Sequence, residues 1–144
     1  MYTTSPEYDD CFAIRQAARH ISQLYERHLS AAQITPTQFN ILAILKRGAR
    51  LTMVELAQAM VMDRTTLVRA VRPLIRDEFI VSQPDDEGSR RLHLFLTDSG
   101  YAKLQEAMTY WVAAQEEFER KFGHQQASDL RSELFRVTRD VSKD

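Results

Sequence analysis

Apolar and basic residues fall on different faces of the stretch from Met62 to Arg76 when it is drawn as a helix. Asp63 precedes this stretch, where a carboxylate can accept hydrogen bonds from the free backbone N–H groups of a first helical turn. The apolar stripe consists of Leu67, Val71, Leu74 and Ile75. The other face carries Thr65, Arg69, Arg72 and Arg76, and no acidic residue occurs from Arg64 to Arg76. The pattern predicts an amphipathic helix with one buried and one basic face.

A short helix is expected just before this one, because Thr52 and Glu55 have the spacing of a capping box. It would be followed by a tight turn that lacks the glycine common in such turns. Thr35 and Gln38 mark a further helix start in the same way, and Gly48 is placed to end that helix. A short helix, a tight turn and a longer basic helix are the arrangement of a helix-turn-helix.

After residue 79 the spacing of the apolar residues changes from the helical period to strict alternation. A polar turn over 84–89 separates two short apolar runs, and Leu92, Leu94 and Leu96 share one face of the second run. Arg90 and Arg91 stand just after the turn. We therefore predict a β-hairpin with arginines near its tip, which together with the preceding helices makes a winged helix.

Long apolar stripes flank this region on both sides. A helix from about Asp10 to about Ser30 should have a broad buried face. Thr97 starts a later helix, which Gly123 ends, and a last helix follows. The later helix has a heptad-like seam of Leu104, Met108, Trp111, Gln115, Phe118 and Phe122. The last helix carries Leu130, Leu134, Val137 and Val141. We expect these stripes to pair with a second copy of the chain. An intramolecular helical bundle is the alternative.

The expected fold is therefore mainly α with a small β-hairpin wing: a winged helix-turn-helix plus N- and C-terminal dimerisation helices. Its parts are an N-terminal dimerisation helix over 1–34, a DNA-binding domain over 35–99 and dimerisation helices over 100–144.

Composition narrows the function classes. The net charge of the 144 residues is −1, so any attraction for nucleic acid must be local, as it is at 64–76. A single cysteine excludes an internal disulfide framework and a Cys-based zinc site. The four histidines are scattered and no glycine-rich phosphate loop occurs. We expect a cytoplasmic protein that is not an enzyme, spans no membrane and carries no metal or cofactor.

Arginine-rich helices and wings suit double-stranded DNA, because guanidinium groups bind phosphates and the edge of guanine. On this basis Arg69 and Arg72 are candidates for the major groove, and Arg90 and Arg91 for phosphates or the minor groove. The alternative from another class is a dimeric helical adaptor that binds protein. It would explain the apolar seams but leaves an acid-free arginine face unexplained.

The ordered motifs resemble the MarR family of transcriptional regulators over roughly residues 10–140. They are Leu51–Ala57, Met62–Arg69, the arginine-bearing wing and Leu96–Gly100. The resemblance implies a homodimer that binds a palindromic operator, usually as a repressor released by a ligand or by oxidation. It also implies that Arg64, Thr65, Thr66 and Arg69 face the groove and that Arg90 is the wing arginine. The sequence departs from the family at Gly88, where an acid is usual, and at Glu78, where a glycine is usual.

The signal remains open between two hypotheses. Cys11 followed by Phe12, with Tyr25 further on, resembles the OhrR-like peroxide sensors of the family, although Arg15 and Pro36 replace two of their tyrosines. A cysteine on an apolar stripe is more often a small packed side chain. The second hypothesis is a small aromatic or phenolic effector. In the family such ligands lie between the DNA-reading lobe and the dimer helices, where Arg15, His20, Tyr25 and Trp111 are candidate contacts.

Overall fold

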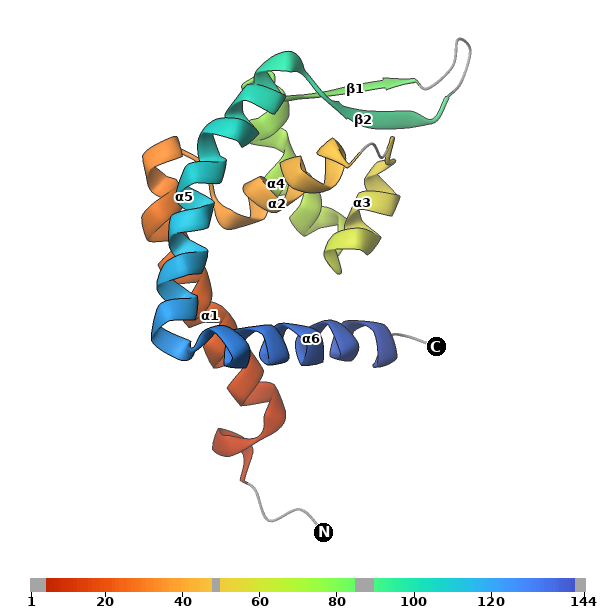
Figure 1. Ribbon diagram of the computed structural model, residues 1–144. Helices are drawn as coiled ribbons and strands as arrows, with labels where there is room; N and C mark the ends of the chain where they lie inside the picture. The colour runs from red at the N-terminus through yellow and green to blue at the C-terminus, as the bar shows by residue number, and fades with distance from the viewer. Residues whose placement is uncertain (1–4, 48–49, 85–89, 142–144) are drawn as a thin grey trace.

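The computed structural model describes residues 5–47, 50–84 and 90–141. Within them the chain forms six α-helices, two short 3-10 turns and a two-stranded antiparallel sheet (Figure 1). The helices are α1 (Asp10–Leu29), α2 (Pro36–Lys46), α3 (Met53–Met60), α4 (Arg64–Arg76), α5 (Asp98–Phe122) and α6 (His124–Asp140). The strands are β1 (Ile80–Pro84) and β2 (Leu92–Leu96), and the 3-10 turns span Pro6–Tyr8 and Ser30–Ala32. The predicted fold class, mainly α with a β-hairpin, is confirmed.

The helices begin where the sequence predicted, because each predicted cap forms its hydrogen bond. Thr35 with Gln38 and Thr52 with Glu55 both form complete capping boxes. The Asp63 carboxylate accepts from the Thr66 backbone N–H at 2.7 Å, and the Thr97 hydroxyl accepts from Gly100 N–H at 3.0 Å. The last turn of α2 ends at Lys46. Gly48, predicted to end that helix, lies outside the described residues.

The core lies beneath the helix-turn-helix and is centred on α2. Ile41 and Leu42 of α2 are fully buried, and α3, α4 and the hairpin contribute Leu56, Leu67 and Leu94. Leu104 and Ala107 close the core from α5. Burial of this size is the main source of stability in a small domain. The core fixes the orientation of α4 relative to the hairpin.

The hairpin is held at its base by a third segment. β1 and β2 pair from Ile80 opposite Leu96 to Pro84 opposite Leu92. Leu51 adds an isolated antiparallel bridge to Leu94, with Leu94 N–H donating to the Leu51 carbonyl at 2.8 Å. Of the three leucines predicted to share one face, Leu94 is buried and Leu96 half-buried. Leu92 is exposed, because it lies toward the tip, beyond the core.

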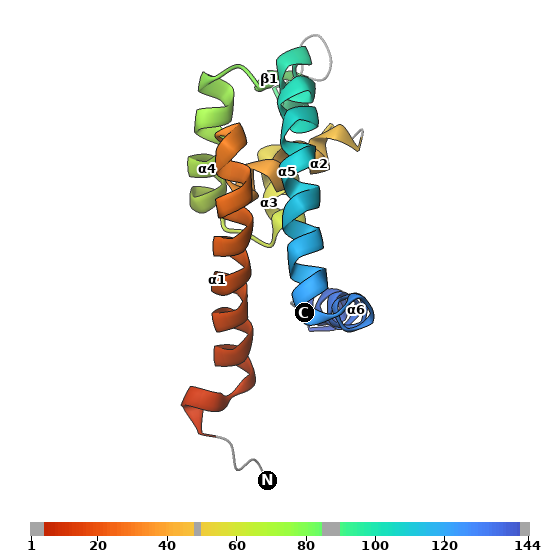
Figure 2. The same ribbon diagram turned by 60° about the vertical axis from the view of Figure 1, so that its left-hand side comes forward.

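The two longest helices, α1 and α5, run side by side (Figure 2), and α6 starts at the end of α5 and turns away from its direction (Figure 1). Within one chain, the apolar face of α1 is buried only in the second half of the helix, so the predicted broad buried face is not complete without a partner. Residues 10–20 are all exposed, and burial begins with Leu24. Four apolar residues of α6 are also exposed: Leu130, Leu134, Phe135 and Val137. In the described part of the chain, no helix is long and apolar enough to cross a membrane.

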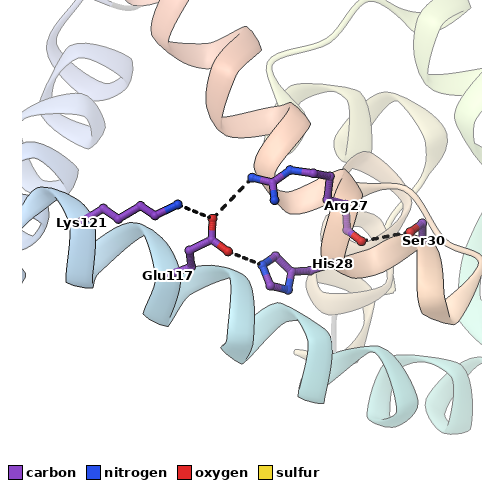
Figure 3. A network of polar contacts seen from close by, with 5 residues as sticks. All are labelled: Arg27, His28, Ser30, Glu117 and Lys121. Carbon is purple, nitrogen blue, oxygen red and sulfur yellow. Dashed lines mark hydrogen bonds and ion pairs between the residues drawn. The ribbon is translucent and has the colours of Figure 1, made fainter.

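A polar network joins α1 to α5 (Figure 3). The Glu117 carboxylate lies 3.0 Å from His28 Nε2, 3.1 Å from Lys121 Nζ and 3.4 Å from an Arg27 guanidinium nitrogen. The hydrogen bond to His28, followed by that from Lys121, lowers the pKa of Glu117 to about 2. The carboxylate therefore stays charged down to low pH and links the two helices.

Candidate nucleic-acid interface and effector site

The structure places all five candidate residues of α4 on its exposed side. Leu67, Val71 and Leu74 are buried beneath the helix. The exposed set is Arg64, Thr65, Thr66, Arg69 and Arg72. The helix continues through Pro73 to Arg76. The amphipathic division predicted from the sequence therefore exists in α4.

The turn between α3 and α4 is closed by a valine in a glycine-like conformation. Val61 has φ 52° and ψ 53°, in the left-handed region. This conformation lets the Met62 backbone N–H donate to the Ala57 carbonyl at 2.9 Å. The turn that lacks the usual glycine therefore keeps a glycine-like geometry at the cost of backbone strain.

The exit from α4 has the same feature. Glu78, where the family usually has glycine, does not lengthen the helix, which ends at Arg76, but adopts φ 64°. Its carbonyl accepts hydrogen bonds from the Thr97 hydroxyl at 2.6 Å and the Ser99 hydroxyl at 2.9 Å. A Cβ at Gly100 would collide with the Phe79 carbonyl. The start of α5 is therefore joined closely to the exit of α4.

The wing arginines and Arg64 of α4 share one groove of about 580 Å³, which we call the wing groove. It is lined by Thr52, Met53, Val54, Glu55, Arg64, Ser82, Arg90, Arg91, Leu92 and Leu94. Among these residues three are arginines and one is an acid. Hydrogen bonds from the Thr52 backbone N–H and hydroxyl lower the pKa of Glu55. The Glu55 carboxylate therefore stays ionised and remains hydrogen-bonded to Thr52 at the start of α3.

The remaining basic residues lie further along α4. Arg72 and Arg76 border a small apolar groove beside Met53 and Val68. Gly88, the wing position where the family usually has an acid, lies outside the described residues. The structure therefore brings together Arg64, Arg90 and Arg91 at the wing groove and leaves Arg69 and Arg72 exposed on the helix face.

Of the five candidate effector or redox residues, only two come together. Tyr25 and Trp111 line a slot of about 240 Å³ between α1, α2 and α5, which we call the aromatic slot. Cys11, Arg15 and His20 are exposed on the first half of α1 and do not line it. Cys11 is thus not packed inside its own chain. The full lining is Ile21, Ser22, Tyr25, Leu29, Pro36, Phe39, Asn40 and Trp111.

Sequence reasoning missed part of this slot. Phe39 stacks on Trp111 with ring centroids 6.0 Å apart and an interplanar angle of 17°. Ser22 and Asn40 add polar groups at its edge. Phe39 was visible only as an apolar residue of a central helix, so its pairing with a residue 72 positions later (111 − 39) had no signal in the sequence. Among the described residues, no group of three or more His, Cys, Asp or Glu residues is arranged to hold a metal ion.

Comparison with known proteins agrees with this geometry. The model of the MarR family matches residues 32–91. The HTH-type transcriptional regulator SarZ of Staphylococcus aureus (strain USA300) is 23% identical over 124 residues, covering 86% of this chain and 82% of SarZ.

Two solved structures extend the similarity to nearly the whole chain. The M. tuberculosis transcriptional regulator MosR, in complex with DNA, is 30% identical with a TM-score of 0.80, covering 92% of this chain and 96% of MosR. The transcriptional repressor CouR, bound to a 23-mer DNA duplex, has the same fold with a TM-score of 0.82 at 21% identity, covering 95% and 99%. These proteins are transcriptional regulators and not enzymes.

Proposed function

Because this chain belongs to the MarR family of transcriptional regulators, we propose that it is a homodimeric repressor that binds a palindromic operator and is released by a small ligand. The observation that carries the DNA-binding part is the wing groove, where Arg64 of α4 meets Arg90 and Arg91 of the wing. Two separate elements present arginines to one groove, and phosphate contacts of this kind position a protein on duplex DNA.

Within this proposal the contacts divide by chemistry. Thr65, Thr66 and Arg69 on the exposed face of α4 enter the major groove and read base edges. Arg72 binds the backbone further along the helix. Arg90 and Arg91 bind phosphates or the adjacent minor groove. MosR and CouR have both been solved with DNA, which supports a duplex as the partner of residues 35–99.

The homodimer is inferred from apolar surface that one chain leaves uncovered. Phe12 and Ile14 on α1, Phe122 on α5, and Leu134 and Phe135 on α6 are all exposed. Large apolar side chains left exposed in this number on the three helices are what a second copy of the chain would cover. Residues 1–34 and 100–144 would form the dimer, and a two-fold dimer places two recognition helices on a palindromic site. Truncation after Gly123 should then give monomers or insoluble protein; a stable dimer without α6 would exclude this arrangement.

Release by a small ligand is inferred from the aromatic slot, which lies between the DNA-reading lobe and α1. CouR has been solved with p-coumaroyl-CoA, so a relative of this fold takes an aromatic ligand. The alternative signal is oxidation of Cys11. Its thiol is exposed near the start of α1, so an oxidant could reach it in a single chain.

The test is selection of bound sequences from a pool of random duplex DNA, with and without mild organic peroxide. We expect an enriched palindromic site. If peroxide abolishes binding and thiol restores it, Cys11 oxidation replaces ligand release as the signal. If peroxide has no effect, the small-ligand mechanism stands. If no sequence is enriched, the operator proposal fails and the helical-adaptor alternative is favoured.

A further inference from the structure

We propose that Lys103 is a positioning residue, which holds the DNA-reading lobe (residues 35–99) against the dimer helices and so restricts the half-site spacing that the protein accepts. The inference rests on the proposed homodimer and its palindromic operator. It is carried by three contacts of one nearly buried ammonium group, each with a different segment of the chain.

The surroundings of Lys103 are unusual for a lysine. Its side chain is only 15% exposed, although lysine is rarely buried without partners. The ammonium donates to the Ala32 carbonyl at 3.0 Å and lies 3.0 Å from a Glu106 carboxylate oxygen on its own helix. It also lies 5.5 Å from the centre of the Phe79 ring, within the range of a cation–π contact. These three groups together fix the position of the ammonium.

The first of these groups lies at the junction of α1 and α2. Ala32 belongs to the 3-10 turn between the two helices and is 1% exposed. Gln33 follows with φ 56°, and its backbone N–H donates to the Ser30 carbonyl at 3.0 Å. This tight turn sets the direction in which α2 leaves α1. Because the Ala32 carbonyl is buried, a lost donor leaves it unsatisfied and the turn is no longer held against α5.

The second group lies at the exit of α4. The Phe79 backbone N–H donates to the Leu74 carbonyl at 2.9 Å, and the Phe79 carbonyl accepts from the Thr97 N–H at 3.1 Å. The Phe79 backbone is therefore tied to the last turn of α4 and to the start of α5. Lys103 stands on α5 one turn beyond Gly100 and reaches both Phe79 and the end of α1. One side chain thus joins a dimer helix to the helix that presents the candidate DNA contacts.

The length of α4 turns a small change at this junction into a large one at the DNA. The helix has 13 residues, so it is about 20 Å long at about 1.5 Å per residue. A tilt of roughly 10° at its exit displaces its first turn by about 3 Å over that length. One base pair of added spacing moves a half-site by about 3.4 Å and turns it by about 34–36°. A lobe that is held firmly cannot follow such a change, whereas a loosened lobe follows it in part.

The test measures half-site spacing with Lys103→Met, which keeps the apolar stem of the side chain and removes the ammonium. Dissociation constants are measured for the selected operator and for operators with one central base pair inserted or deleted. The readout is the ratio of the altered to the selected operator. We expect this ratio to fall by at least about threefold in Lys103→Met, because the loosened lobe tolerates the wrong spacing better. A smaller fall overturns the inference.

If Lys103→Met does not fold, Phe79→Leu takes its place. It removes the ring beneath the ammonium and keeps an apolar side chain at the exit of α4. The same fall in the spacing ratio is expected, and the same threshold of about threefold decides the result. Glu106→Gln removes only the ion pair on the half-exposed side of Lys103, so its ratio should stay within about twofold of the wild type.

Two controls separate positioning from loss of charge and loss of stability. Lys46→Met makes the same change at an exposed lysine of α2, and Ile41→Val weakens the buried core. Both should leave the spacing ratio within about twofold of the wild type, even where Lys46→Met weakens binding to every duplex. If Ile41→Val lowers the ratio as far as Lys103→Met does, general destabilisation explains the effect and the inference fails.

The wild-type protein separates failure of this inference from failure of the proposed function. If no palindromic site is enriched, the proposed function is refuted and the inference falls with it. If an operator is bound but the three spacings are bound equally well, the inference alone is refuted.

Discussion

The strained turn of the helix-turn-helix makes Val61→Gly an expected stabilising substitution, although it removes an apolar side chain. Val61 adopts φ 52° and ψ 53°, and its side chain is 72% exposed. A left-handed backbone costs an L-residue about 1–2 kcal/mol, because Cβ approaches the following carbonyl oxygen. A β-branched side chain is especially rare in this conformation. Glycine has no Cβ and is free of this cost.

Two opposing effects set the net magnitude. Glycine loses more backbone entropy on folding than other residues, which costs about 0.5–1 kcal/mol. The largely exposed valine side chain contributes little burial, so its loss is a small further cost. The balance is a gain of about 0.5–1 kcal/mol in the free energy of unfolding. For a chain of this length that corresponds to a rise in Tm of roughly 2–3 °C.

The assay is thermal or denaturant unfolding at one fixed protein concentration, because the stability of a dimer depends on concentration. Val54→Gly is the matched control, since it makes the same chemical change within α3, at a helical position where the side chain is 51% exposed. It should lower stability by about 1 kcal/mol, because glycine is unfavourable inside a helix and half of the side chain is buried. If Val61→Gly lowers stability as Val54→Gly does, the strain argument for the turn is refuted.

Three further predictions concern DNA binding and pH. Arg69→Ala should weaken operator binding by about 1–3 kcal/mol without changing the dimer, whereas Arg120→Ala on α5 should not; unchanged affinity in a mobility-shift titration would remove Arg69 from the recognition surface. Arg90→Ala should weaken binding to operator and random duplex alike and reduce the slope of log K against log salt by about 0.9. Loss confined to the operator would mean that Arg90 reads bases. Because the pKa of Glu117 is lowered to about 2 from an ordinary 4.5, its stabilising effect is complete above pH 4.5 and disappears as pH falls toward 2. Unfolding of Glu117→Gln should therefore depend less on pH in that window, and an identical pH dependence would show that the network does not stabilise the fold.

Local signals in the sequence were sufficient for the helices and the wing. Asp63, Thr35, Thr52 and Thr97 are short side chains whose oxygen reaches backbone N–H groups within three residues, so helix starts can be predicted from neighbouring positions alone. The basic face of α4 could likewise be predicted, from the helical spacing of its arginines. The wing arginines could be predicted from their position directly after a polar turn.

Contacts between distant segments were not visible in the sequence. The Leu51–Leu94 bridge and the Phe39–Trp111 stack join residues far apart in the chain, and neither has a local pattern. Arg15 and His20 were candidate ligand contacts with Tyr25 because the family's ligands lie next to the dimer helices, but they are exposed on the first half of α1 and do not line the slot. The left-handed backbone conformation of Val61 was also not predicted, because left-handed turns are usually recognised from a glycine or asparagine and not from a valine.

The close approach at Gly100 also determines how motion passes through the subunit. Because no Cβ separates them and the Thr97 and Ser99 hydroxyls both donate to the Glu78 carbonyl, we expect the first turn of α5 and the exit of α4 to move together. Trp111 lies 11 residues beyond Gly100 (111 − 100), about 16 Å along the helix axis at about 1.5 Å per residue. A sideways shift of about 1 Å at Trp111 therefore tilts a rigid α5 by roughly 3–4° over that ~16 Å lever arm and rotates α4 through the same angle. In a two-fold dimer both recognition helices would rotate by this amount, so we expect a small displacement in the aromatic slot to alter their relative orientation.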